Sequence, residues 1–208
     1  MKQFLPRKKS FKSVFFIFVC VLFFSLSAAA ADVIIQLPDP QKTGGMPLMQ
    51  AITERKSDRT FTSKKISEQT LSDLLYTAFG VSHEKKFTIP TSMNRGNLKV
   101  FVVRGDGTWL YIPEKNILSR VTAEDLRPHL ATQSFVLQAP ISLVYTGSDP
   151  VNSPLHAGSA YQNVGLYCAS VGLNNVVRAS FDKESFAKEL NLGTGEKVIV
   201  SQSIGWAK

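Results

Sequence analysis

The sequence is poor in the residues that build disulfides and metal sites. It contains two cysteines and three histidines among 208 residues. Cys20 lies inside an N-terminal apolar run, so Cys168 is the single thiol of the remaining chain, which excludes an internal disulfide and a structural zinc site there. His83, His129 and His156 are scattered without the spacing of metal ligands. We therefore predict no metal site and expect these histidines at the surface or at helix ends.

Motifs of several enzyme classes are also missing. The sequence has no Walker-type phosphate loop, no glycine-rich dinucleotide fingerprint and no nucleophile elbow. It has no internal repeat and no low-complexity tract. These absences remove P-loop NTPases and Rossmann dehydrogenases from the candidate classes. A Ser-His-Asp triad stays open, because its members need not be close in sequence.

The positive charge is concentrated at the N-terminus. The chain has 24 Lys and Arg against 16 Asp and Glu, which gives a net charge of +8. Five of these cations precede an apolar run over residues 13–27, and four alanines follow at positions 28–31. This order predicts a secretory signal peptide over residues 1–31, cut near Ala31. The alternative is an uncleaved anchor, although the run is shorter than the about 20 residues of a membrane span.

Cleavage at this point changes what the charge implies. Residues 1–31 contain five cations and no acid, so the remaining 177 residues carry a net charge of +3. A nucleic-acid-binding interpretation based on overall charge therefore fails. We expect an exported protein, most simply periplasmic, with no stable membrane insertion after cleavage.

The rest of the chain mixes helical and strand patterns. Residues 32–46 are rich in Pro and Gly and predict a flexible arm, followed by a domain over residues 47–208. Predicted helices cover residues 46–54, 67–79, 122–131, 156–171 and 183–190. Predicted strands cover residues 98–103, 108–112, 139–145, 176–177 and 197–201. This order favours the α+β class, with helices packed around a small sheet.

Two polar segments are candidates for binding. Arg55, Ser57 and Arg59 alternate, so an extended chain would point two guanidinium groups and a hydroxyl the same way, as suits a phosphate. The alternative is a solvated basic helix end. The stretch over residues 89–95 forms a polar turn that could present hydroxyls and an amide to a polyol or a ring edge, or could be an ordinary loop.

A third segment lies on the predicted helix over 156–171. Gln162 and Asn163 interrupt its apolar pattern. They could line a binding site, or they could satisfy neighbouring backbone groups inside a core.

Read together and in order, these segments resemble one family. RKSDRTF, PTSMN and HAGSAYQNVGLYCASVGLNNVV are followed by a Phe-Asp helix start and a near-terminal Ile-Gly-Trp. This series, from about Met46 to the end, is similar to the FMN-dependent nitroreductase family. With its short chain, the protein looks nearest to the branch of the family that contains the dehydrogenases of thiazole- and oxazole-containing peptide synthesis.

The resemblance implies a fold, a cofactor and a set of contacts. The fold would be an α+β sandwich with a central, mostly antiparallel sheet flanked by helices, in an intertwined homodimer with FMN at the subunit interface. Arg55 and Ser57 would bind the phosphate and ribityl end of FMN, and Lys56 would also contact the flavin. Arg59 would lie near N1 and O2 of the ring. The partner's FMN would be reached by Pro90, Thr91, Ser92 and Asn94. Backbone groups around Arg178, Ala179 and Ser180 would approach N5 and O4, although relatives often have Gly near Ala179, and Lys208 would approach the phosphate.

The implied activity is two-electron transfer between the flavin and a small organic substrate, with a nitro-aromatic or quinone-like acceptor as the example. Arg59 is permanently charged and would stabilise negative charge at N1. No side chain is assigned as a catalytic acid or base. One alternative is a non-catalytic flavin- or ligand-binding exported dimeric module, and another is a secreted interaction protein without cofactor.

Overall fold

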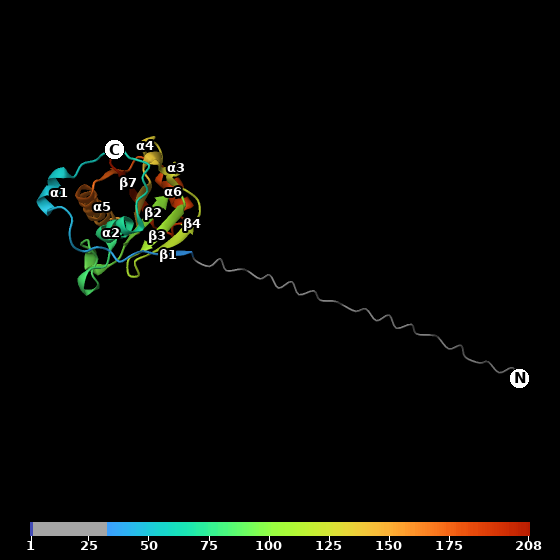
Figure 1. Ribbon diagram of the computed structural model, residues 1–208. Helices are drawn as coiled ribbons and strands as arrows, with labels where there is room; N and C mark the ends of the chain where they lie inside the picture. The colour runs from blue at the N-terminus through green and yellow to red at the C-terminus, as the bar shows by residue number, and fades with distance from the viewer. Residues whose placement is uncertain (2–32) are drawn as a thin grey trace. The chain divides into compact units, whose positions relative to one another are not determined.

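The computed structural model describes Met1 and residues 33–208, and a compact unit spans Asp32–Lys208. The predicted signal peptide lies almost wholly outside the described residues. The compact unit holds a seven-stranded sheet flanked by helices (Figure 1). No helix in the described part of the chain combines the length and apolarity needed to cross a membrane.

The sheet is open, and every neighbouring pair of strands is antiparallel. Its order is β1-β4-β3-β2-β5-β7-β6. The strands are β1 (Ile34–Gln36), β2 (Leu98–Arg104), β3 (Gly107–Ile112), β4 (Ile117–Thr122), β5 (Ile141–Gly147), β6 (Leu173–Arg178) and β7 (Lys197–Trp206). All seven residues of β5 are buried, which agrees with its central place. The predicted α+β class with a mostly antiparallel sheet is confirmed.

Helices cover both faces of the sheet. α2 (Glu68–Phe79) and α5 (Asn152–Val171) share one hydrophobic cluster with Val100 and Val102 of β2. The alternate residues Phe101 and Val103 join a second cluster with side chains of α3 (Arg127–Leu130), α4 (Phe135–Gln138) and α6 (Lys183–Glu189). α1 (Leu48–Glu54) lies against α5. Because side chains of a strand alternate between faces, β2 contributes to both cores.

The local signals around the long helices account for their ends. The Ser67 hydroxyl caps α2 by accepting from the Thr70 N–H at 3.1 Å. α5 begins at Asn152, four residues before the predicted start, and tolerates Pro154 because the proline lies in the first turn. It ends where Gly172 adopts a left-handed φ of 78°.

The predicted helix over 122–131 is correct only over Arg127–Leu130, because Thr122 ends a strand and residues 123–126 are neither helix nor strand. The strand, β4, was not predicted and pairs with β3 from Ile112↔Ile117 to Thr108↔Thr122. Ile117 and Leu118 are buried. Because Thr122 pairs with β3 and Asp125 Oδ1 accepts the Arg127 N–H at 3.0 Å, the helix begins only after these residues.

The segment predicted to be a flexible arm is anchored to the domain. β1 pairs with β4 at one edge of the sheet, and Leu37 is buried. Further along, the Gln41 N–H donates to Asp73 Oδ1 and the Met46 N–H donates to Ser170 Oγ, each at 2.7 Å. These bonds fix the segment along α2 and α5.

Candidate functional site

A basic loop over residues 55–60 follows α1 and runs beside the edge strand β6. The Arg55 N–H still donates to Ala51 O at 2.9 Å, which closes the last turn of α1. The Asp58 N–H then donates to Asn175 O at 2.9 Å, and Asn174 Nδ2 donates to Thr60 O at 2.8 Å. The loop is therefore held against the sheet by backbone and amide bonds, and these bonds do not involve the side chains of Arg55 and Arg59.

Asp58 folds the basic loop back on itself. Its Oδ1 accepts from the Thr60 hydroxyl at 2.6 Å and from the Thr60 N–H at 2.9 Å, and Lys56 Nζ lies 3.3 Å from Oδ2. These hydrogen bonds, led by that from the Thr60 hydroxyl, lower the pKa of Asp58 to about 2. The only carboxylate of the loop is thus engaged by Thr60 and Lys56.

Replacing Asp58 with Ala should lower the thermal midpoint by about 2–4 °C, because about 1 kcal/mol of turn stabilisation is lost. The folded-state pKa lies below the ordinary 3.8, so the difference from wild type should be constant near neutral pH. It should shrink as the pH falls from about 4 towards 2, where the carboxylate is protonated in both states. Asp58→Asn keeps the acceptor oxygen and is the control. Equal midpoints for the wild type and both variants would contradict this role.

The stem of Arg55 lies across a glycine of α5. A Cβ atom placed on Gly165 would sit 3.4 Å from both Cγ and Cδ of Arg55. The missing side chain therefore provides the surface on which the arginine packs. This contact puts Arg55 beside the later half of α5.

Arg59 and Arg178 lie over the ring of Phe135, and we call these three residues the arginine–phenylalanine cluster. The Cζ atoms of Arg59 and Arg178 lie 5.8 Å and 5.4 Å from the ring centroid. Arg178 is 5% exposed and donates to Leu130 O at 2.8 Å and Ser180 O at 3.1 Å. Burial and the neighbouring charge of Arg59 lower the pKa of Arg178, yet a guanidinium stays protonated at neutral pH.

No carboxylate balances these charges. Within residues 33–208, none of Arg55, Arg59 and Arg178 forms an ion pair. A buried cation without an acid partner is costly unless other groups compensate it. The β6 edge therefore presents a positive potential that suits an anionic ligand.

Ala179 and Ser180 follow directly after β6 and are exposed. Their carbonyl oxygens accept bonds from the chain itself, from the Phe181 N–H and from the Thr132 hydroxyl. Their own N–H groups have no protein acceptor in the described part of the chain. The donors at this position are thus available to a ligand that offers an acceptor.

The polar turn over residues 90–94 lies elsewhere. Its Ser92 N–H donates to Nε2 of His156, near the start of α5, at 3.2 Å. His156 and Gly165 are nine residues apart, which corresponds to about 13 Å along a helix. Within one protomer the structure therefore separates Pro90, Thr91, Ser92 and Asn94 from the basic loop.

Lys208 is exposed at the end of the chain, where the Ala207 N–H donates to Gly172 O at 3.4 Å. Its side chain has no ion pair with the described residues.

Two residues of this region were not identified correctly from the sequence. His156, expected at the surface or a helix end, is 4% exposed in the core. Phe135 and its two arginines come from three separate segments, and no local pattern links them. The other two histidines, His83 and His129, are exposed. No group of three potential metal ligands occurs in the described residues.

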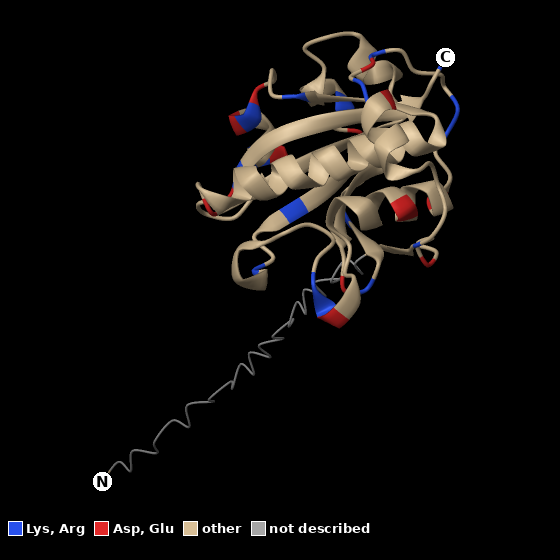
Figure 2. Cartoon of the chain, turned by 90° about the vertical axis from the view of Figure 1, so that its left-hand side faces the viewer, with Lys and Arg blue, Asp and Glu red and all other residues tan. Residues whose placement is uncertain are grey.

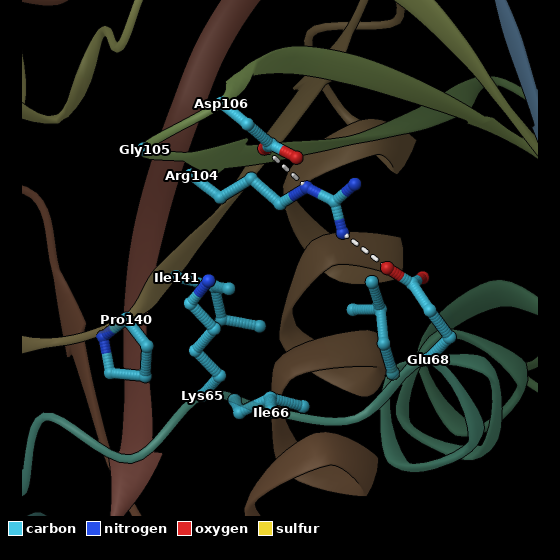
Figure 3. A pocket seen from close by; sticks show the side chains of 9 residues that line it. Lys65, Ile66, Glu68, Arg104, Gly105, Asp106, Pro140 and Ile141 are labelled. Carbon is cyan, nitrogen blue, oxygen red and sulfur yellow. Dashed lines mark hydrogen bonds and ion pairs between the residues drawn. The ribbon is translucent and has the colours of Figure 1, made fainter.

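A pocket of about 420 Å³ contains none of the predicted site residues. It lies between the start of α2 and the turn that joins β2 to β3 (Figure 3). Arg104 reaches Glu68 at 3.0 Å and Asp106 at 2.6 Å, so the guanidinium is already neutralised by two acids of the chain. The arrangement ties α2 to the β2–β3 turn and offers no unbalanced charge to a ligand.

An apolar surface lies on the side of α1 and α5. Leu48, Met49 and Ile52 of α1 are 64%, 72% and 46% exposed, and Leu155 of α5 is 65% exposed. α5 contains no charged residue along its 20 positions, and the longest helix in Figure 2 is accordingly uncharged throughout. A pocket of about 340 Å³ opens between α1, α2 and α5. Exposed apolar side chains gathered on neighbouring helices are typical of an interface.

Comparisons with known proteins agree on one family. The sequence model of the "Nitroreductase family" matches residues 52–206. A protein of Methanocaldococcus jannaschii that carries a nitroreductase name is 30% identical over 173 residues, covering 72% of this chain and 86% of that protein.

Solved structures show the same fold. A crystal structure from Ralstonia eutropha, also named as a nitroreductase, matches with a TM-score of 0.79 and 34% identity, covering 84% of this chain and 90% of that one. A chain of the Escherichia coli microcin synthetase McbBCD complex matches with a TM-score of 0.64 and 20% identity, covering 84% of this chain and 79% of that one. At this identity the second likeness concerns the fold alone.

Proposed function

Because the chain belongs to the nitroreductase family, we propose that it binds FMN and transfers two electrons to or from a small organic substrate. Members of this family are oxidoreductases and typically depend on a flavin. The observation that carries this proposal is the set of arginines beside β6 that form no ion pair within residues 33–208. FMN is an anion through its phosphate and acquires further negative charge at N1 when reduced, so it suits a site with excess positive charge.

The residues present fit the cofactor. Arg55 and Ser57 are exposed or half-buried in a loop fixed by backbone bonds, and they would bind the phosphate and ribityl end. Lys56 and Lys208 are exposed cations that would approach the flavin and the phosphate. The free N–H groups at Ala179 and Ser180 suit the acceptors N5 and O4. Bound FMN would supply the redox chemistry, while the chain binds and orients it.

Arg59 would act as a fixed positive charge. Its guanidinium lies over Phe135 and interacts electrostatically with Arg178. Arg178 is held in place by its hydrogen bonds to Leu130 O and Ser180 O. Since no acid of the described part of the chain neutralises either arginine, their field would favour an adjacent anionic group. No proton donor is needed among the side chains for this role.

We further propose a homodimer in which each site uses both subunits. The polar turn is separated from the basic loop along α5 of its own protomer. An antiparallel packing of α5 against its copy would place the polar turn of one subunit near the basic loop of the other. The exposed residues Leu48, Met49, Ile52 and Leu155 would be covered by this contact.

The test is a flavin spectrum. The protein is expressed from the full chain, purified, mixed with FMN and desalted. We expect one retained FMN per subunit. A folded protein that retains no flavin would overturn the proposal. If FMN is retained but no donor reduces it and no nitro-aromatic or quinone reoxidises it, the non-catalytic flavin-binding module replaces the enzyme.

We also propose that the protein is exported to the periplasm. The support is the basic head, the apolar run and the alanines before Asp32. Expression in a bacterium with an active export pathway should give a periplasmic product whose intact mass corresponds to 177 residues beginning at Asp32. A product of full-length mass retained in the membrane fraction would instead identify an uncleaved anchor.

A further inference from the structure

His156 occupies an unusual position for a polar side chain. It lies on the second turn of α5, is 4% exposed, and accepts the Ser92 N–H through Nε2 at 3.2 Å. A neutral imidazole that accepts at Nε2 carries its proton on Nδ1. Nδ1 is buried and has no hydrogen-bond partner within residues 33–208. An unsatisfied buried donor is destabilising, so the packing of α5 alone gives no reason for a histidine here.

The polar turn that His156 holds has few other restraints. Met93 and Asn94 adopt left-handed φ angles of 52° and 53°. This conformation is tolerated by Asn but strained for Met93. Both side chains are exposed. The backbone of the turn forms hydrogen bonds within the turn itself. Asn94 Nδ2 adds a long contact of 3.5 Å to Lys85 O.

We infer that His156 is the positioning residue of the polar turn: the bond from the Ser92 N–H to Nε2 holds residues 90–94 in the conformation that contacts FMN of the partner subunit. This inference rests on the proposed function, because it needs the turn to reach a cofactor. His156 itself touches neither substrate nor cofactor. His156 acts through Ser92. For this role a side chain at position 156 needs a hydrogen-bond acceptor at about the distance that Nε2 of histidine reaches.

Two substitutions separate the acceptor from the packing. His156→Met fills a similar volume without a comparable acceptor. His156→Gln places an amide oxygen where Nε2 lies and should restore the bond. His129→Met is the matched control, because His129 contacts Glu189 and not the polar turn. Circular dichroism and thermal unfolding show that each variant is folded.

Two readouts are measured. In cofactor-free protein, His156→Met should raise amide exchange in residues 90–95 about fivefold, the effect of one lost hydrogen bond. In FMN titrations it should raise the dissociation constant by about three- to tenfold. His156→Gln and His129→Met should remain within about twofold of wild type in both readouts.

A backbone variant completes the test. Thr91 is extended, with φ −128° and ψ 142°, and Ser92 begins a 3₁₀ turn, so Ser92→Pro removes the N–H at a position that tolerates proline. In amide exchange, the double variant Ser92→Pro/His156→Met should be no faster than the more affected single variant, because both remove the same bond. FMN affinity is not compared in this cycle, because Ser92→Pro also removes a hydroxyl proposed to contact the cofactor.

The outcomes are distinguishable. If His156→Met exchanges and binds FMN like wild type, or if His156→Gln is as impaired as His156→Met, the inference is overturned. Faster exchange with unchanged FMN affinity also overturns it, because the turn would then not serve the cofactor. If the wild type binds no FMN, the proposed function and the inference both fail, while the exchange result still shows whether His156 holds the turn.

Discussion

The double substitution Arg55→Ala/Arg59→Ala is expected to abolish retention of FMN. Each arginine would make a charge-assisted contact worth about 1.5–3 kcal/mol. Losing both removes about 3–6 kcal/mol, which corresponds to roughly a 150- to 20,000-fold rise in the dissociation constant. Fluorescence titration of FMN measures this change, and desalting shows whether any flavin remains bound.

The fold should survive this change. Arg59 is exposed and Arg55 is half-buried, and neither forms an ion pair within the described residues. Arg120→Ala is the matched control, since it removes a guanidinium from β4, towards the opposite edge of the sheet. It should leave the affinity for FMN unchanged. Retention of stoichiometric FMN by a folded double variant would place the cofactor site elsewhere.

The second large effect is expected at the apolar surface of α1. Replacing Leu48 and Ile52 with Lys should convert the proposed dimer to a monomer at micromolar concentration. Burying an aliphatic side chain contributes about 1.5–3 kcal/mol, and a two-fold interface buries each residue twice. The substitutions therefore remove about 6–12 kcal/mol and add four charges to the interface. Light scattering coupled to size-exclusion chromatography measures the mass.

The monomer should also lose FMN, because the polar turn of the partner would be absent from the site. Val121→Lys is the control for adding a lysine at an exposed apolar position, since Val121 lies on β4, towards the opposite edge of the sheet. It should remain dimeric and bind FMN. A folded monomer that retains FMN would show that one protomer holds the whole site, and an unchanged dimer would place the interface on another surface.

The basic loop shows which residues of the candidate site can be predicted from local sequence. The alternation of Arg55, Ser57 and Arg59 allowed either an anion-binding loop or a solvated basic helix end. The structure places this loop beside the edge strand, with no ion pair for either arginine within residues 33–208. The sequence did not indicate Phe135 or the burial of the Arg178 guanidinium. Those features require Arg178 of β6 to lie beside Phe135 of α4 and Leu130 of α3, which are more than 40 residues away in the sequence. The sheet and the short helices packed on it bring these residues together.

What the sequence by itself determined are the elements with strong local signals: the capped, amphipathic α2, the hairpin of β2 and β3, and the apolar central strand β5. Only the tertiary structure decided that residues 117–122 extend the sheet, that residues 34–36 pair with them, and that His156 is buried against the polar turn. Capping and periodicity act within a few residues and can be read along the chain. Strand pairing and burial depend on partners that are distant in sequence, and here their hydrogen bonds and excluded surface outweigh the local preferences.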